Sequence, residues 1–289
     1  MQEIPELFGK GRPLFSFEFF LPKAPEDLGK LVAEVKALKS LSPDYISLTY
    51  GAGGSARART IDAAGLLQAE TGITTACHLT GIAHSRGEIA DILGRLNRLG
   101  IRHLVALRGD APKDQPVLPP GQRDFGYAED LVRFIKAQGG FRMAVAAYPE
   151  THSEAVSPED DVKRFAAKAA AGGEWGLTQL FFDNKSYFSF VKQARAAGST
   201  VPIVPGIMPV TSFAQLARFK TMFAARIPAE LEDRVTAVQN DPEAIIAEGI
   251  EWSARQCREL LDGGAPGIHF YTLNRSHSTS EILSRLRRT

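Results

Sequence analysis

The sequence predicts an α/β protein, a (β/α)8 TIM barrel that forms one catalytic domain over residues 1–289. Short apolar runs rich in β-branched and aromatic residues alternate with longer segments of helical period. Most repeats take ~30 residues, which is the length of a strand-helix-strand unit with parallel strands. Eight such runs occur, and that number favours a closed barrel over an open sheet.

The elements follow one another in a regular order. We expect strands at residues 14–20, 45–50, 73–79, 101–107, 141–148, 176–182, 201–207 and 267–273. We expect helices at residues 27–39, 56–70, 87–99, 128–138 and 186–197, and another that begins after Ser157 and stops at Gly172. Residues 209–266 add extra helices between strands seven and eight. Residues 111–122 form a polar loop that is either a lid or a simple mobile connection.

Composition narrows the classes of partner and compartment. The formal net charge is +1, so no overall field points to nucleic acid or to an anionic membrane, and neither partner is expected. Cys77 and Cys257 are the only cysteines, so neither a disulfide framework nor a thiolate zinc site is supported. No apolar run reaches ~18 residues and the N-terminus lacks an apolar signal segment, so we expect a cytoplasmic protein.

Polar residues follow the apolar runs at nearly every expected strand. The clearest case is the run at 101–107, which leads directly into Arg108, Gly109 and Asp110. In a barrel the carboxyl ends of the strands meet on the face that carries the active site. The polar residues at these ends are Glu18, Thr49, Tyr50, His78, Arg108, Asp110, Tyr148, Glu150, His152, Gln179, Asp183, Tyr271, Asn274 and Arg275. Each one alone could serve a turn or a buried hydrogen bond, but together they favour a binding site.

Glu18 is the most informative of these residues. Aromatic residues flank it on both sides along the first strand. Partial burial would disfavour its charged form and raise its pKa, as a general acid near neutral pH requires. The alternative is an outward-facing carboxylate that pairs with a surface lysine such as Lys23.

Metal and phosphate motifs are weak in this sequence. Residues 51–54, which are rich in glycine, could cradle a phosphate at a helix N-terminus or simply form a tight turn. No His-x-His or His-Glu-x-x-His motif occurs, so we expect no catalytic metal, and His103 inside a strand is expected to be a core or outward-facing residue. A metal-dependent barrel hydrolase or aldolase remains an alternative. Its ligands would come from His78, Glu150, His152 and Asp183.

A series of motifs at the strand ends resembles methylenetetrahydrofolate reductases of the short bacterial type. The motifs are FEFF at 17–20, LTYGA at 48–52, CHLT at 77–80, ALRGD at 106–110, AYPExH at 147–152, TQLFFD at 178–183, PGIMP at 205–209 and FYTLNR at 270–275. The resemblance implies a (β/α)8 barrel that binds FAD and takes hydride from NADH or NADPH. It implies ping-pong transfer through flavin N5 to 5,10-methylenetetrahydrofolate, giving 5-methyltetrahydrofolate for one-carbon and methionine metabolism.

The resemblance also implies roles for individual residues. Glu18 matches the general acid that assists opening of the folate imidazolidine ring, Asp110 an aspartate between flavin and pterin, and Gln179 a folate-binding amide. The positions that match FAD contacts are Thr49, His78, Arg108, Gly109, Asp110, Tyr127, Ala128, Ala146, Tyr148, His152, Asp161 and Lys168. The positions that match substrate contacts are Glu18, Asp110, Gln179, Gln215, Phe219 and Arg275.

Some expectations are less sharply defined by the residues. We expect NADH rather than NADPH because no basic cluster stands out as a 2′-phosphate site, and we expect a homo-oligomer. Leu21 and Leu180 replace the proline and phenylalanine that are common in the family, which affects substrate geometry more than the reaction. A pterin-binding module without redox activity is a further alternative. It would keep Asp110 and Gln179 but would need no flavin.

Overall fold

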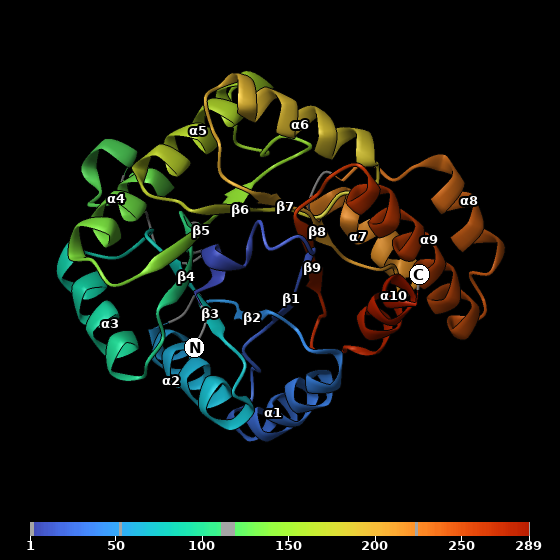
Figure 1. Cartoon of the computed structure of the whole chain (residues 1–289), viewed down its shortest axis with the longest axis horizontal. Helices are drawn as coiled ribbons and strands as arrows, with labels where there is room; N and C mark the ends of the chain where they lie inside the picture. The colour runs from blue at the N-terminus through green and yellow to red at the C-terminus, as the bar shows by residue number, and fades with distance from the viewer. Residues whose placement is uncertain (1–2, 52–53, 111–118, 223–224, 289) are drawn as a thin grey trace.

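A closed sheet of parallel strands, surrounded by helices, forms the body of the chain (Figure 1). The computed structural model describes residues 3–51, 54–110, 119–222 and 225–288. The strands in this part of the chain are β1 (Leu14–Phe19), β2 (Tyr45–Leu48), β3 (Thr75–Thr80), β4 (His103–Leu107), β5 (Arg142–Ala147), β6 (Trp175–Thr178), β7 (Ile203–Val204), β8 (Gly206–Ile207) and β9 (Gly267–Tyr271). They pair in the order β7-β6-β5-β4-β3-β2-β1-β9-β8. The predicted barrel is confirmed.

The barrel closes through one short segment that lies between β6 and β9. Its first half, β7, pairs with β6, and its second half, β8, pairs with β9. Pro205 separates the halves because proline has no N–H to donate to a ladder. The Pro205 carbonyl instead accepts the backbone N–H of His269 at 2.9 Å. The predicted strand at 201–207 is therefore correctly placed, but the prediction of one continuous strand is wrong.

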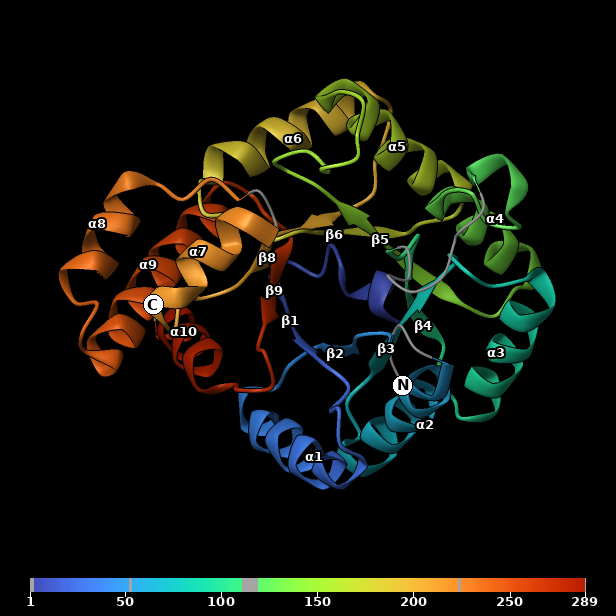
Figure 2. The ribbon, with the colours of Figure 1, turned by 180° about the vertical axis from the view of Figure 1, so that it is seen from behind.

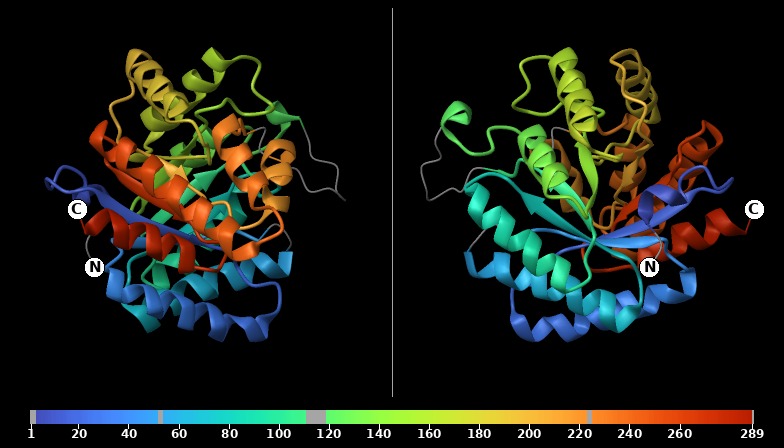
Figure 3. Two further views of the ribbon diagram at one scale, coloured as in Figure 1. Left: turned by 90° about the vertical axis from the view of Figure 1, so that its right-hand side faces the viewer. Right: turned by 60° about the vertical axis from the view of Figure 1, so that its left-hand side comes forward.

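Helices form the outer layer. They are α1 (Leu28–Ala37), α2 (Gly54–Thr71), α3 (Arg86–Arg98), α4 (Ala128–Gln138), α5 (Pro158–Ala171), α6 (Asn184–Ala196), α7 (Phe213–Met222), α8 (Ala229–Ala237), α9 (Pro242–Asp262) and α10 (His277–Arg287). Short 3-10 helices are η1 (Ile4–Leu7), η2 (Pro25–Asp27), η3 (Leu38–Leu41) and η4 (Pro120–Gln122). The views from behind and from the side show this layer on the outside of the strands (Figures 2 and 3). None of the described helices is long and apolar enough to cross a membrane.

The start of α5 follows the predicted capping pattern. The Ser157 hydroxyl accepts the backbone N–H of Asp160, and Pro158 occupies the first helical turn, where a missing N–H costs nothing. Gly172 ends the helix at φ +131°. The extra helices α7, α8 and α9 pack together through a separate apolar cluster that includes Phe219, Leu231 and Trp252.

The alternation of side chains along each strand separates an inner from an outer core. On β1, Phe15, Phe17 and Phe19 belong to the cluster between the strands and the helices. The residues between them face the barrel interior, because side chains two apart share one face of a strand. Leu14 belongs to the inner cluster, which η1 joins through Ile4 and Leu7.

η1 lies inside the ring of strands (Figures 1 and 2) and fills its amino-terminal end. His103 on β4 holds η1 in place, because its Nε2 accepts the backbone N–H of Ile4 at 3.1 Å. His103 is 3% exposed, so of the two expected placements, core or outward-facing, the structure shows the core one. Because η1 fills only the amino-terminal end, the carboxyl half of the barrel interior remains available for polar groups.

Candidate functional site

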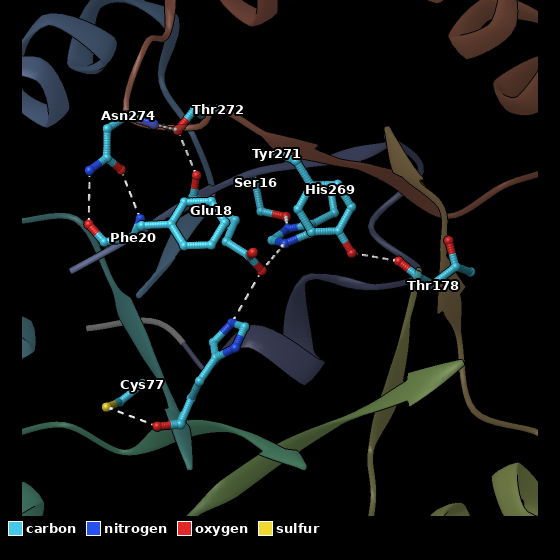
Figure 4. Close-up of polar contacts among 10 residues, drawn as sticks. Ser16, Glu18, Phe20, Cys77, Thr178, His269, Tyr271, Thr272 and Asn274 are labelled. Atoms are coloured by element: carbon cyan, nitrogen blue, oxygen red, sulfur yellow. Dashed lines mark hydrogen bonds and ion pairs between the residues drawn. The ribbon is translucent and has the colours of Figure 1, made fainter. Parts of the chain in front are cut away.

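Four polar side chains, Ser16, Glu18, His78 and His269, form a buried polar array in the carboxyl half of the barrel interior. Glu18 on β1 points inward and is 6% exposed, which excludes the surface pairing with Lys23. One of its oxygens, Oε2, lies 3.2 Å from His78 Nε2 on β3 and 3.4 Å from His269 Nε2 on β9. Behind His269, the Ser16 hydroxyl lies 2.8 Å from Nδ1 (Figure 4). Strands β1, β3 and β9 thus place two imidazoles against one carboxylate.

These imidazoles reverse the expected titration of Glu18. Burial opposes ionisation of the carboxyl group, but His78 and His269 outweigh it and lower the pKa of Glu18 to about 2. The burial predicted for this residue is correct, whereas the predicted rise in its pKa is wrong. The sequence pattern indicated the desolvation of Glu18 but not the two rings that stabilise its charged form.

The end of β1 is clamped to the turn after β9. The Thr272 hydroxyl donates to the Glu18 carbonyl at 2.6 Å. The Asn274 side chain accepts the backbone N–H of Phe20 at 2.7 Å and donates to the Phe20 carbonyl at 2.9 Å (Figure 4). Asn274 adopts φ +59°, a left-handed conformation that asparagine tolerates better than most residues. This turn fixes the strand end that carries Glu18.

A cavity of about 450 Å³ opens at the carboxyl ends of β4, β5 and β6. It extends over the starts of α4 and α5, as expected for the active-site face of a barrel. Many residues that the sequence assigns to FAD or folate line it. They are Arg108, Gly109, Asp110, Tyr127, Ala128, Ala146, Tyr148, His152, Asp161, Lys168 and Gln179.

Cationic side chains and aromatic rings lie together in this cavity. Lys168 Nζ donates to the Ala146 carbonyl at 2.7 Å and lies 5.6 Å from the centre of the Tyr148 ring. Burial lowers the pKa of Lys168 to about 8, although Asp161 opposes that shift. Arg108 forms an ion pair with the exposed carboxylate of Glu154.

The loop after β5 is held against α5. The backbone N–H of His152 donates to Asp161 Oδ2 at 2.8 Å, and the His152 ring meets the Tyr148 ring edge-on at 4.7 Å between centroids. Thr151 adopts φ +70°, an uncommon value for a β-branched residue. These contacts direct the backbone between Tyr148 and His152 around the cavity wall.

Gly109 is required by the close approach of two loops. Its φ is +85°, and an added Cβ would lie 2.8 Å from Thr80 Cβ and 2.9 Å from Ile82 Cγ2. Only glycine fits both the backbone conformation and this spacing. The close approach determines where Arg108 and Asp110 stand at the cavity.

Tyr271 connects the buried array with the cavity wall. Its hydroxyl donates to the Thr178 carbonyl at 2.7 Å, and its ring meets the His269 ring edge-on at 5.4 Å (Figure 4). The residue after Thr178 is Gln179, which lines the cavity and accepts the Leu180 backbone N–H at 3.0 Å. The array and the cavity are therefore adjacent parts of one region.

Other predicted site residues lie outside the cavity lining. Besides Glu18 and His78 in the array, Thr49 follows β2, where its backbone N–H donates to the Phe19 carbonyl. Gln215 accepts the Thr211 and Ser212 backbone N–H groups at the start of α7.

Phe219, also on α7, is 3% exposed and packs against Phe182 at 5.3 Å. Arg275 is exposed in the turn after β9. Residues 52–53 of the glycine-rich segment and residues 111–118 of the candidate lid lie outside the described residues.

Sequence reasoning missed His269 and Arg164. The available signal for His269 was side-chain alternation. His269 lies two positions before Tyr271 and Ser16 two positions before Glu18, so each pair shares one face of its strand. Arg164 lies on α5, 3.8 Å from the centre of the Tyr127 ring. Its only signal was helical spacing within α5.

The four candidate metal ligands contact other groups in the structure, and His152 Nδ1 accepts the backbone N–H of Glu154 at 3.1 Å. His78 contacts Glu18, and Asp183 caps the start of α6. Glu150 accepts the backbone N–H of Arg226 at 3.1 Å. Within the described ranges, no three His, Cys, Asp or Glu side chains gather as a metal-binding group.

Comparison with known proteins adds independent evidence. The family model for methylenetetrahydrofolate reductase matches residues 1–287. The 5,10-methylenetetrahydrofolate reductase of Pectobacterium carotovorum subsp. carotovorum is 39% identical over 285 residues, covering 99% of this chain and 93% of that protein. Methylenetetrahydrofolate reductase (NADH) 1 of Zea mays is 33% identical over 297 residues, covering 99% of this chain and 50% of the maize protein.

A solved structure supports the fold alone. A protein from Clostridium thermocellum, described as binding two copies of 5-methyl-5,6,7,8-tetrahydrofolic acid, has a TM-score of 0.64 at 13% identity and covers 98% of each chain. The family match and the bacterial relative cover almost the whole chain. The chain therefore belongs to the methylenetetrahydrofolate reductase family of oxidoreductases.

Proposed function

We propose that this chain binds FAD in the cavity and uses NADH to reduce 5,10-methylenetetrahydrofolate to 5-methyltetrahydrofolate. The observation that carries the proposal is the convergence of three strand-end motifs, ALRGD at 106–110, AYPExH at 147–152 and TQLFFD at 178–183, on one cavity. Residues from β4, β5, α4 and α5, together with Gln179 after β6, line that cavity, although they are distant in sequence. A simple structural role for each residue would not require them to share one open space.

The cavity chemistry fits a flavin dinucleotide. Arg108 and Lys168 are cations suited to a diphosphate, and Tyr127 and Tyr148 present aromatic rings to the same space. Lys168 is buried and has a carbonyl as its hydrogen-bond acceptor, so it retains donors for an anionic ligand. Bound FAD would supply the hydride chemistry that no amino-acid side chain provides.

Residues of the chain would supply the proton and orient the substrate. We assign to Glu18 the delivery of a proton to the folate nitrogen that leaves when the imidazolidine ring opens. Asp110 and Gln179 line the cavity and would orient the pterin through hydrogen bonds. Gln215, Phe219 and Arg275 are proposed further substrate contacts, and Phe219 would have to leave its packing against Phe182 to act as one.

NADH is the proposed hydride donor. Of the cations that line the cavity, Arg108 and Lys168 are assigned to FAD, and Arg164 is paired with Glu129. A 2′-phosphate would need an unpaired basic group. The maize relative carries an NADH designation, which agrees with this choice. We also propose that the chain forms one catalytic domain and assembles as a homo-oligomer. Sedimentation would measure the oligomeric state.

An anaerobic visible spectrum tests the proposed function. The purified protein is incubated with FAD, desalted, and titrated first with NADH and then with methylenetetrahydrofolate. We expect yellow colour that bleaches with NADH and returns with the folate. A protein that stays colourless contradicts FAD binding. Bleaching that the folate does not reverse contradicts the proposed acceptor, and direct folate binding without colour would favour the pterin-binding module.

A further inference from the structure

His269 is a buried titratable group for which the family resemblance gives no role. It is fully buried, and both of its ring nitrogens have partners, with Nε2 3.4 Å from Glu18 Oε2 and Nδ1 2.8 Å from Ser16 Oγ. Figure 4 shows the ring between these two side chains. Other rings cover it, since Tyr45 stacks at 6.2 Å and Tyr271 meets it edge-on. Among the described residues, Glu18 is the carboxylate in hydrogen-bond contact with His269.

The proposed reaction needs a proton that ionised Glu18 does not carry. Reduction of a methylene bridge to a methyl group adds a hydride to the carbon and a proton to the nitrogen that leaves it. Because His78 and His269 keep Glu18 ionised at neutral pH, the transferable proton must reside on a neighbouring group. The imidazoles of His78 and His269 are the basic groups in contact with Glu18.

The partner of His269 suits a ring that gains and loses a proton. When the ring is protonated, Nδ1 donates to the Ser16 hydroxyl and Nε2 donates to the Glu18 carboxylate. When Glu18 has taken the Nε2 proton, the neutral ring keeps its hydrogen on Nδ1, which still donates to Ser16, and Nε2 accepts from the Glu18 O–H. Neither state leaves a buried nitrogen without a partner, which would cost free energy in this interior.

His78 is less suited to hold the transferable proton. Its Nε2 lies 3.2 Å from the same Glu18 oxygen, but no aligned hydrogen bond to that nitrogen exists among the described residues. The other titratable groups near the array are Tyr45 from β2 and Tyr271 from β9. Burial raises the pKa of both phenols, so they stay neutral.

We propose that His269 is a positioning residue that holds, as an imidazolium, the proton that Glu18 passes to the folate. The Nε2–H bond of His269 breaks as the O–H bond of Glu18 forms. The O–H bond then breaks as the folate nitrogen gains the proton, and the electron pair of the broken carbon–nitrogen bond stays on that nitrogen. Between turnovers, a proton from solvent passes through Glu18 to His269 Nε2 and restores the imidazolium. This inference rests on the proposed function.

The kinetic test compares His269→Gln with wild type in the FAD-loaded enzyme. Glutamine can still donate to Glu18 but cannot store a proton. We expect the single-turnover rate of the folate half-reaction to fall by about 100-fold or more, with a changed pH profile, while NADH still reduces the flavin within about twofold of wild type. His103→Gln is the matched control, because it makes the same substitution at an equally buried barrel histidine at the opposite end. We expect the control to retain both rates.

A second readout does not depend on turnover. The chain has six histidines, so labelled imidazoles can be followed individually by NMR, with His269 identified by its proximity to the Tyr271 ring. In Glu18→Gln we expect His269 to titrate at a pH lower by about 1 unit or more, a tenfold loss of proton affinity. This measurement applies even if His269→Gln does not fold.

The outcomes separate the two ideas. Wild-type protein that does not turn over methylenetetrahydrofolate overturns the proposed function, and the NMR titration still tests whether Glu18 and His269 share a proton. An active wild type with an unchanged His269→Gln pH profile overturns the inference alone. A His269 titration that is the same in wild type and Glu18→Gln also overturns it.

Discussion

Replacing Gly109 with alanine should damage the cavity through a single added methyl group. Gly109 stands between Arg108 and Asp110 at φ +85°, and the new Cβ would lie 2.8 Å from Thr80 Cβ and 2.9 Å from Ile82 Cγ2. Real Cβ atoms do not approach other atoms this closely, so the loop after β4 must shift. The shift would move both neighbouring side chains away from their places in the cavity lining.

The size of the effect follows from two costs. The left-handed backbone costs an L-residue ~1–2 kcal/mol, and the steric overlap adds ~1–3 kcal/mol. The free energy of unfolding should therefore fall by ~2–5 kcal/mol, a decrease in Tm of roughly 4–10 °C for a chain of this size. Misplacing the Arg108 guanidinium removes a charge-assisted contact worth ~1.5–3 kcal/mol, so FAD should bind ~10–100-fold more weakly.

A matched control separates backbone strain from the steric overlap. Gly198, after α6, has φ +86° but no atom within 4 Å of an added Cβ. Gly198→Ala should therefore show the backbone cost alone and bind FAD like the wild type. The measurements are thermal unfolding and fluorescence titration with FAD. Equal Tm values for the two variants, together with unchanged FAD affinity in Gly109→Ala, would refute this reasoning.

Three further predictions concern charged groups. Glu18→Gln should leave FAD reduction by NADH intact and slow the folate half-reaction by ~10²–10⁴-fold in stopped-flow measurements, and equal turnover would remove the acid role of Glu18. Lys168→Met should weaken FAD binding. The FAD affinity of the wild type should fall as the pH rises through about 8, where Lys168 loses its proton, whereas the affinity of the variant should not change over this range. Fluorescence titration with FAD at several pH values would measure both. Burial lowers the pKa of His103 to about 4 from its usual value of about 6.5, so its contribution to stability is present above pH 6.5 and is lost as the pH falls toward 4. The free energy of unfolding, measured with urea at several pH values, should therefore depend less on pH in His103→Gln. The same pH dependence in the variant and the wild type would contradict this.

Local chemistry made much of the fold predictable. Alternating side chains, β-branched runs and capping residues report on a few neighbouring positions, so the strands and α5 could be placed from the sequence. Part of the cavity could also be predicted, because Arg108, Gly109 and Asp110 directly follow a strand and the strand ends of a barrel share one face. Other lining residues, Tyr127, Ala128, Ala146, Asp161 and Lys168, were indicated only by the family resemblance.

Tertiary structure decided which distant residues meet. The barrel closes by pairing β1 with β9, which sets Ser16 beside His269 and Glu18 beside Tyr271, more than 250 positions apart. Burial raises the pKa of Glu18, but His78 on β3 lowers it, and the imidazole of His269 lowers it further because the ends of the chain come together. The sequence alone indicated a carboxylate between aromatic residues on the first strand, and the tertiary structure determined that it is buried beside two imidazoles and ionised. Side-chain alternation is a local property, whereas the register between the first and last strands depends on packing of the whole ring.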